Sequence, residues 1–133
     1  MGIRCVQIIV VYQKEILVLE EKTMNQTKIS LPLGIIEPGE SNLQAAIRNC
    51  YEETGIVVTQ RDLIKELKDY MLQKNDIVTY VKPLVFRICD KQTPEIMNEK
   101  ISHIYYMRIS HFKEKCKYNK ELNLIGDTIK FLE

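Results

Sequence analysis

The sequence predicts a layered domain of the α+β or α/β/α type, and three observations carry this prediction. Runs of β-branched and apolar residues alternate with short polar turns along most of the chain. The one helix with clear signals at both ends lies between predicted strands. A chain of 133 residues fits one domain and buries roughly two thirds of its unfolded surface, so we expect a single domain spanning residues 1–133.

The N-terminal third is predicted to contain two strands and a shaped loop. Residues 3–12 and 15–20 are apolar and β-branched, and Gln13-Lys14 joins them as a short turn. Residues 25–28 are expected to be a polar loop. The stretch "ISLPLGIIEPGES" holds two prolines and two glycines, and its Pro38-Gly39 pair suits the centre of a type II turn.

A short amphipathic helix follows this loop. Ser41 and Gln44 form a capping-box pattern at its start, and Gly55 is placed to end it. Helical spacing places an apolar stripe on one side and Asn49, Glu52 and Glu53 on the other. The residues of that stripe are Leu43, Ala46, Ile47, Cys50 and Thr54.

The C-terminal half is expected to add strands and then helix. Residues 56–59 and 63–73 are β-like, and Asn75-Asp76 turns the chain into a strand over residues 77–89. Pro83 is expected to bend this strand or place it at an edge of the sheet. A polar loop over 90–100 leads to a strand at 101–109. The remaining residues are expected to be helical, with a first helix from Ser110 or His111 and helical spacing near the C-terminus that Gly126-Asp127 interrupts.

Composition excludes several classes of function. The formal net charge of +1 offers no general attraction for nucleic acid or for an anionic membrane. The apolar run over residues 5–12 is far shorter than the ~20 residues that span a bilayer. The four cysteines have no C-x-x-C spacing, and Cys50 and Cys89 lie in apolar patterns, so we expect buried, reduced thiols and a cytoplasmic protein.

The loop and the helix together carry acidic side chains suited to a metal. Glu37 and Glu40 lie in the loop, and Glu52 and Glu53 stand side by side on the helix. Carboxylates crowded in this way repel one another unless they face water or a cation. Mg²⁺ prefers carboxylate and carbonyl oxygens and shares its coordination shell with phosphate groups.

These residues resemble the signature of the Nudix (MutT-like) hydrolases, G-x5-E-x7-R-E-U-x-E-E-x-G-U, where U is a bulky aliphatic residue. Gly34, Glu40, Arg48, Glu52, Glu53 and Gly55 stand at the required spacing, and Ile56 fills the last U position. The resemblance implies a Nudix-type α/β/α sandwich with a mixed sheet and with the motif loop and helix on one face. It also implies divalent-metal-dependent hydrolysis of a small nucleoside diphosphate-linked substrate.

The same resemblance implies roles for individual residues. Glu52 and Glu53 would hold Mg²⁺ or Mn²⁺, with the carbonyl of Gly34 and, more weakly, Glu40 as further ligands, while Arg48 orients the carboxylates. Two positions depart from the family pattern. Asn49 stands where the family has a glutamate that serves the metal site or acts as a base, and Leu33 replaces a glycine.

Asparagine supplies neither a charge nor a useful proton acceptor, so reduced activity is expected. Two interpretations stay open. Either the protein is an enzyme whose base comes from Asp90, Glu95 or Glu99 in the polar loop, or it is an impaired Nudix-fold module that binds or senses nucleotides. The sequence specifies neither the substrate nor the choice between monomer and homodimer.

Overall fold

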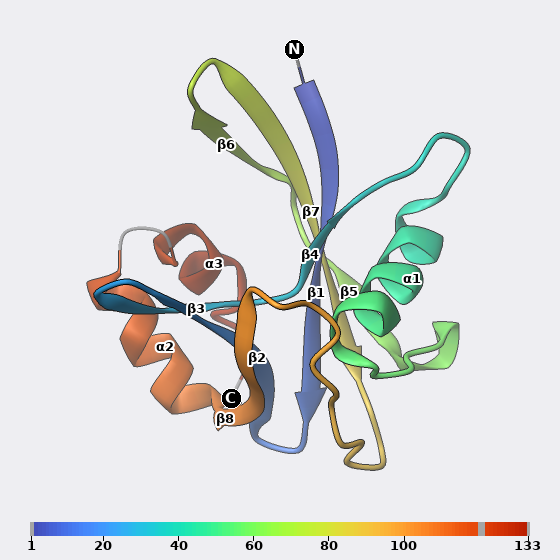
Figure 1. Cartoon of the computed structure of the whole chain (residues 1–133). Helices are drawn as coiled ribbons and strands as arrows, with labels where there is room; N and C mark the ends of the chain where they lie inside the picture. Colours follow the sequence, from blue (N-terminus) through green and yellow to red (C-terminus); the bar gives the residue numbers. More distant parts are fainter. Residues whose placement is uncertain (1, 120–121, 133) are drawn as a thin grey trace.

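The computed structural model describes residues 2–119 and 122–132, and its centre is a mixed β-sheet (Figure 1). The strands β1 and β7 run parallel side by side at this centre, whereas the other paired strands are antiparallel. The strand bounds are β1 (Gly2–Tyr12), β2 (Glu15–Thr23), β3 (Gln26–Ser30), β4 (Leu33–Ile35), β5 (Leu63–Glu66), β6 (Tyr70–Lys74), β7 (Ile77–Arg87) and β8 (Ile101–Arg108).

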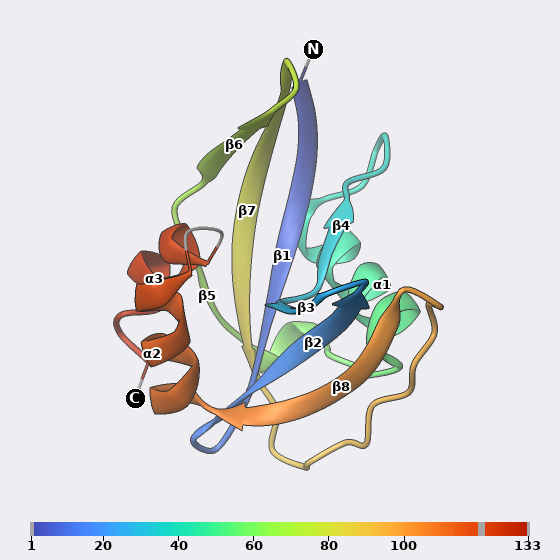
Figure 2. The same cartoon turned by 60° about the vertical axis from the view of Figure 1, so that its left-hand side comes forward.

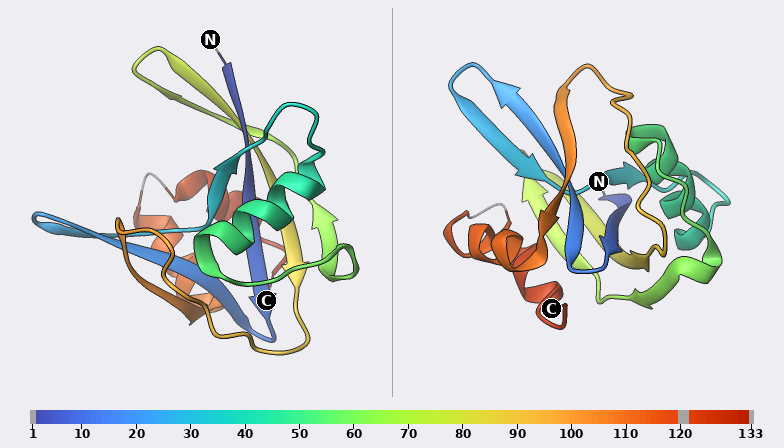
Figure 3. Two further views of the ribbon diagram at one scale, coloured as in Figure 1. Left: turned by 45° about the vertical axis from the view of Figure 1, so that its right-hand side comes forward. Right: turned by 90° about the horizontal axis from the view of Figure 1, so that it is seen from below.

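Helices cover both faces of this sheet, as Figures 1 and 3 show. On one side lies α1 (Asn42–Thr54); on the other lie α2 (Ile109–Tyr118) and α3 (Asn123–Thr128). A short 3₁₀ turn, η1 (Gln60–Asp62), precedes β5. The predicted α/β sandwich with a mixed sheet and with the motif helix on one face is therefore confirmed.

Alternation along β1 explains how one strand serves two cores. Its side chains at Val6, Ile8 and Val10 pack with Ala46 and Cys50 of α1. Successive strand residues point to opposite faces, so Ile9 and Val11 join a second core with α2 and α3. None of the described helices is long and apolar enough to cross a bilayer.

The strand β1 changes partners along its length, which opens the sheet near the motif. Its C-terminal end pairs with β2 through Val11 and Tyr12, whereas its N-terminal half pairs with β4 through Cys5, Val6 and Gln7. The strands β2 and β3 therefore diverge from β1 and pair with one another, and β8 curves along the outer edge of β2 (Figure 2).

Several predictions about individual segments were wrong. Residues 25–28 are largely strand, because β3 pairs with β2 across a two-residue turn. Pro83 does not mark an edge, since β7 lies between β1 and the strands β5 and β6. The proline instead occupies the gap where pairing with β6 stops and pairing with β5 begins, so its missing N–H breaks no ladder hydrogen bond to them.

The cysteine prediction holds in part. All four thiols are free. Cys50 is fully buried on the side of α1 that faces the sheet, but Cys89, which lies beyond the end of β7, is exposed. In the C-terminal segment, Gly126 lies within α3 instead of interrupting it. A Cβ atom at Gly126 would lie 2.9 Å from the Cβ of Cys116, so glycine allows α2 and α3 to pack closely.

Candidate active site

The helix α1 presents the signature residues, and both of its ends match the sequence prediction. The hydroxyl of Ser41 accepts a hydrogen bond from the backbone N–H of Gln44, and the side-chain oxygen of Gln44 accepts one from the backbone N–H of Ser41. Gly55 ends the helix in the left-handed region, with φ of 74°. These caps fix where α1 begins and ends, and the packing of Ala46 and Cys50 against β1 sets the directions in which the polar side chains of the helix point.

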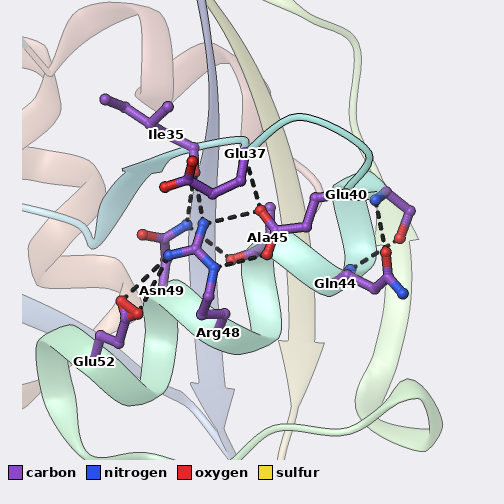
Figure 4. Close-up of polar contacts among 9 residues, drawn as sticks. Ile35, Glu37, Glu40, Gln44, Ala45, Arg48, Asn49 and Glu52 are labelled. Carbon is purple, nitrogen blue, oxygen red and sulfur yellow. Dashed lines mark hydrogen bonds and ion pairs between the residues drawn. The ribbon is translucent and has the colours of Figure 1, made fainter.

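Arg48 ties the motif loop to the helix (Figure 4). Its Nε and Nη2 atoms donate to the two carboxylate oxygens of Glu40, at 2.7 and 2.9 Å. The Nη1 atom donates to Glu52 at 3.2 Å, and Nη2 also donates to the Ile35 carbonyl at 3.0 Å. One guanidinium therefore positions the loop, β4 and one acidic side chain of the helix together.

Glu40 has a structural role in this geometry. Besides the paired bonds from Arg48, its Oε1 atom accepts the backbone N–H of Glu37 at 2.9 Å. The hydrogen bonds from Arg48 and then from Glu37 lower the pKa of Glu40 to about 2. Both carboxylate oxygens are thus engaged by Arg48 of α1 and by the loop backbone, which disfavours the weaker prediction that Glu40 is a metal ligand.

Asn49 lies in a different place from the one predicted. It is only 8% exposed, because β4 covers the side of α1 that the helical pattern assigned to solvent. Its Nδ2 atom donates to the carbonyls of Ala45, at 2.8 Å, and Ile35, at 3.2 Å. The carboxamide therefore acts as a link between α1 and β4.

Gly34 makes this link possible through the absence of a side chain. A Cβ atom at Gly34 would lie 1.9 Å from the Oδ1 atom and 2.1 Å from the Cγ atom of Asn49. The backbone of β4 thus rests directly on the Asn49 carboxamide. The signature glycine and the substituted signature position form one packing unit.

Glu53 lies in a cleft of about 760 Å³ that opens where the sheet divides. Burial is the main cause that raises its pKa to about 7, and the nearby charges of Glu21 and Glu52 add to the shift. Glu21 and Glu52 therefore place further negative charge near Glu53 at this end of the cleft. Glu52 is not among the cleft residues, and its side chain remains 55% exposed beside Arg48.

The donor chemistry at this end of the cleft fits a divalent cation. Among the described residues, no three His, Cys, Asp or Glu side chains already form a metal cluster. Mg²⁺ does not require such a cluster, since it is commonly bound by one or two carboxylates, with waters and substrate phosphates completing its shell. Glu53 and Glu52 can supply those carboxylates, and a cation would relieve the repulsion that raises the pKa of Glu53.

The acidic residues of the polar loop lie elsewhere. Asp90, Glu95 and Glu99 are exposed, and none of them is among the described residues that line the cleft. Glu95 packs beside Gly55, and its backbone N–H donates to the Thr54 carbonyl at 2.7 Å. This geometry offers no support for a base supplied by these three residues.

Sequence reasoning missed three polar residues of the cleft, which are Gln7, Glu21 and Tyr70. Glu21 stands in an ordinary charged stretch at the end of β2, so no local pattern identifies it. Gln7 did leave a signal, because it is the one polar residue in the apolar run over 5–12. The other cleft residues are a mixture of apolar side chains, among them Leu31, Ile101 and Ile125, and polar ones, among them Lys28, Asn75 and Asn98.

Comparison with known proteins places the chain in a family. The NUDIX domain model matches residues 3–123, so the chain belongs to the Nudix family, and the predicted resemblance to Nudix hydrolases is confirmed. No curated protein sequence gives a significant match. The particular member is therefore characterised through its site and its structural neighbours.

The solved structures that resemble this chain share its fold at low sequence identity. An Ap4A hydrolase from C. elegans, solved as a binary complex, has a TM-score of 0.71 and 16% identity, with 96% of this chain and 93% of that chain covered. A NUDIX hydrolase from Nitrosomonas europaea has a TM-score of 0.68 and 20% identity over 90% and 81% of the two chains. The NUDIX domain of Shewanella oneidensis NrtR, solved with ADP ribose, has a TM-score of 0.68 and 15% identity over 86% and 77%.

Proposed function

We propose that this protein hydrolyses the pyrophosphate bond of a small nucleoside diphosphate-linked substrate and depends on Mg²⁺ or Mn²⁺. The observation that carries the proposal is the position of Glu53. This carboxylate faces a cleft large enough for a nucleotide, beside the charges of Glu21 and Glu52, and close to the signature loop. Crowded carboxylates in a cleft are expected where a cation and a polyphosphate bind.

Glu52 and Glu53 are the residues that would hold the cation, whereas the carbonyl of Gly34 faces Val6 in the β1–β4 ladder and is left out. When bound, a divalent ion neutralises charge on a diphosphate and lowers the pKa of a coordinated water. Glu40 is left out because both of its carboxylate oxygens already accept hydrogen bonds, from Arg48 of α1 and from the backbone of Glu37. Arg48 positions Glu52 and fixes β4 against the helix, which keeps the Gly34 backbone in place.

Glu21 is the carboxylate that we propose as a partial substitute for the glutamate missing at position 49. It lines the same cleft as Glu53 and is close enough to raise the pKa of that residue. Its carboxylate belongs to a residue of β2 and not of α1, so its distance from the reacting phosphorus differs from that of a carboxylate on the helix. We therefore expect lower turnover than in members with an intact signature.

The structural neighbours support the class of substrate. One is described as an Ap4A hydrolase and another was solved with ADP ribose, and Ap4A and ADP ribose each carry adenosine on a chain of phosphates joined by phosphoanhydride bonds. These similarities show that the fold is shared. The proposed substrate class rests on the acidic side chains and the cleft of this chain.

A phosphate-release assay over nucleoside triphosphates, sugar nucleotides and dinucleoside polyphosphates tests the proposal. Glu53→Gln should abolish most of the turnover, and so should a chelator. Glu66→Gln, which changes an exposed carboxylate on β5, is the matched control and should retain full activity. Activity that persists in chelator or in Glu53→Gln would contradict the proposal.

A second candidate function, a nucleotide-binding module without turnover, is favoured by the geometry of Asn49. Its amide donates to two backbone carbonyls, so position 49 offers no proton acceptor. This candidate predicts nucleotide binding by calorimetry with no product in the assay. If Asn49→Glu raises turnover by orders of magnitude, the site is an impaired enzyme; unchanged turnover by a folded, active Asn49→Glu variant favours a carboxylate elsewhere, and Glu21 is the candidate.

A further inference from the structure

The polar pair Gln7 and Tyr70 lies at the floor of the cleft and has no role in the proposed metal chemistry. We propose that Gln7 is a specificity-determining residue that donates a hydrogen bond to an acceptor on the nucleobase of the substrate, and that Tyr70 is the residue that positions it. This inference rests on the proposed function, because it concerns the part of the substrate that lies beyond the diphosphate.

Gln7 is an unusual residue for its position in the sheet. It is 4% exposed, and its neighbours Val6 and Ile8 are fully buried. Burying a carboxamide with unmade hydrogen bonds is destabilising by about 1–3 kcal/mol, so an apolar side chain would serve the fold better. The presence of glutamine in the middle of β1 therefore calls for a polar partner.

The register of β1 places Gln7 on the floor of the cleft. It lies opposite Leu33 of β4 and beside Pro83 of β7. Alternation along the strand puts it on the same face as Ile9, which packs against the α2 and α3 side of the sheet. The cleft passes from this face, through the point where the sheet divides, to Glu53 of α1, so Gln7 and the acidic end share one continuous cavity.

Tyr70 fixes the orientation of the Gln7 carboxamide. The Tyr70 hydroxyl donates to the Oε1 atom of Gln7 at 2.7 Å, which directs the carbonyl end of the amide toward β6. Burial of Tyr70 raises the pKa of its hydroxyl well above the ordinary value, so the hydroxyl keeps the proton that it donates. The Gln7 amide therefore cannot rotate freely between its two orientations.

The Nε2 atom of Gln7 is left for a ligand. It makes no hydrogen bond to another described residue. Across the described part of the chain, no side-chain nitrogen or oxygen is both fully buried and without a partner. Since Gln7 lines the cleft, its Nε2 atom is reached from the cleft and offers N–H donors there.

The surroundings of this donor suit a flat, largely apolar ring. Apolar side chains from several elements line the same cleft as Gln7; they include Leu31, Leu72, Ile77, Ile101, Leu122 and Ile125. A nucleobase offers such a surface to pack on, with ring nitrogens or carbonyl oxygens at its edge as acceptors. A pocket of this kind binds through apolar area and gains specificity from a few fixed polar groups.

The test measures binding, so that it does not depend on turnover. Calorimetry in Mg²⁺ would compare α,β-methylene nucleoside diphosphates carrying each common base with methylenediphosphonate, which has no base. The wild type should prefer one base. Gln7→Met, which keeps the length of the side chain, should weaken binding of the preferred analogue about 10-fold and remove the preference, while leaving methylenediphosphonate unchanged.

Two further variants make the result interpretable. Tyr70→Phe should reduce the base preference in the same direction, and it decides the question if Gln7→Met does not fold. Gln60→Met makes the same chemical change at an exposed residue of η1 that does not line the cleft, and it should have no effect. The inference is overturned if the wild type shows no base preference, if Gln7→Met and Tyr70→Phe keep it, or if either weakens methylenediphosphonate equally. Base-selective binding without turnover would instead contradict the proposed hydrolysis alone.

Discussion

The contact between Gly34 and Asn49 allows a quantitative prediction about the signature loop. The backbone dihedral angle φ of Gly34 is not positive, so alanine is tolerated there by the backbone alone. A methyl group would nevertheless lie 1.9 Å from Oδ1, 2.1 Å from Cγ and 2.6 Å from Nδ2 of Asn49. The whole carboxamide must move, and both of its hydrogen bonds, to Ala45 and Ile35, are then lost.

The size of the effect follows from those two bonds. Each buried hydrogen bond contributes about 1 kcal/mol, and forcing the carboxamide out of a packed site adds about 1–2 kcal/mol, so Gly34→Ala should destabilise the fold by about 2–4 kcal/mol. Asn49→Ala alone should be destabilising by about 2 kcal/mol. Once Asn49 is already alanine, nothing of its carboxamide remains to be displaced, and Gly34→Ala should then be destabilising by less than about 1 kcal/mol.

Urea unfolding of the wild type, the two single variants and the double variant measures this coupling. We expect the double variant to lose about 2 kcal/mol less unfolding free energy than the two single variants lose together. Gly2→Ala is a comparison for the effect of an added methyl group on the free energy of unfolding. The atom closest to its new methyl group, at 2.9 Å, belongs to the side chain of Tyr80. Additive free energies of unfolding for Gly34→Ala and Asn49→Ala would refute the packing argument.

Two further predictions concern the charged groups. The pKa of Glu53 is raised from 4.5 to about 7, so the folded state holds this proton more tightly than the unfolded state. In chelator, the contribution of Glu53 to stability should therefore be greatest below about pH 4.5 and fall by at most about 3 kcal/mol as the pH rises to 7 and above. Mg²⁺ should restore stability at the high end, and Glu53→Gln should remove this pH dependence; a chelated wild type equally stable across this window would contradict the assigned pKa. Arg48→Lys retains the charge but cannot reach Glu40, Glu52 and the Ile35 carbonyl together, so kcat should fall about 10- to 100-fold. Arg61→Lys, at an exposed residue of η1, should leave kcat unchanged, and an equal loss in both variants would show that the effect is not specific to the clamp.

Local signals in the sequence were sufficient for the parts of the fold that local interactions determine. The helix α1 and the acidic residues on it were identified correctly. The evidence was the capping box at Ser41, the C-cap glycine Gly55 and the spacing of the signature. The turn at Asn75-Asp76 was also correct, since both residues adopt positive φ in the β6–β7 hairpin. Each of these features depends on side chains within a few positions of one another.

Features that depend on distant partners were missed. Helical spacing assigned Asn49 to solvent, because nothing in the helix reveals that β4 will cover it. Pro83 suggested that its strand lies at the edge of the sheet. The sequence does not show that β5 and β6 each pair with a different part of that strand, β7. Glu21 approaches Glu53 only once β2 is paired in the sheet.

The central claim is that the acidic end of the cleft binds a divalent cation through Glu53. Titration of Mn²⁺ followed by electron paramagnetic resonance measures this directly, with wild type, Glu53→Gln and the exposed-residue control Glu66→Gln compared at pH 8. The account predicts that the wild type and Glu66→Gln bind Mn²⁺ with the same affinity and that Glu53→Gln binds it at least about 10-fold more weakly. Equal Mn²⁺ affinity in all three proteins would contradict the claim.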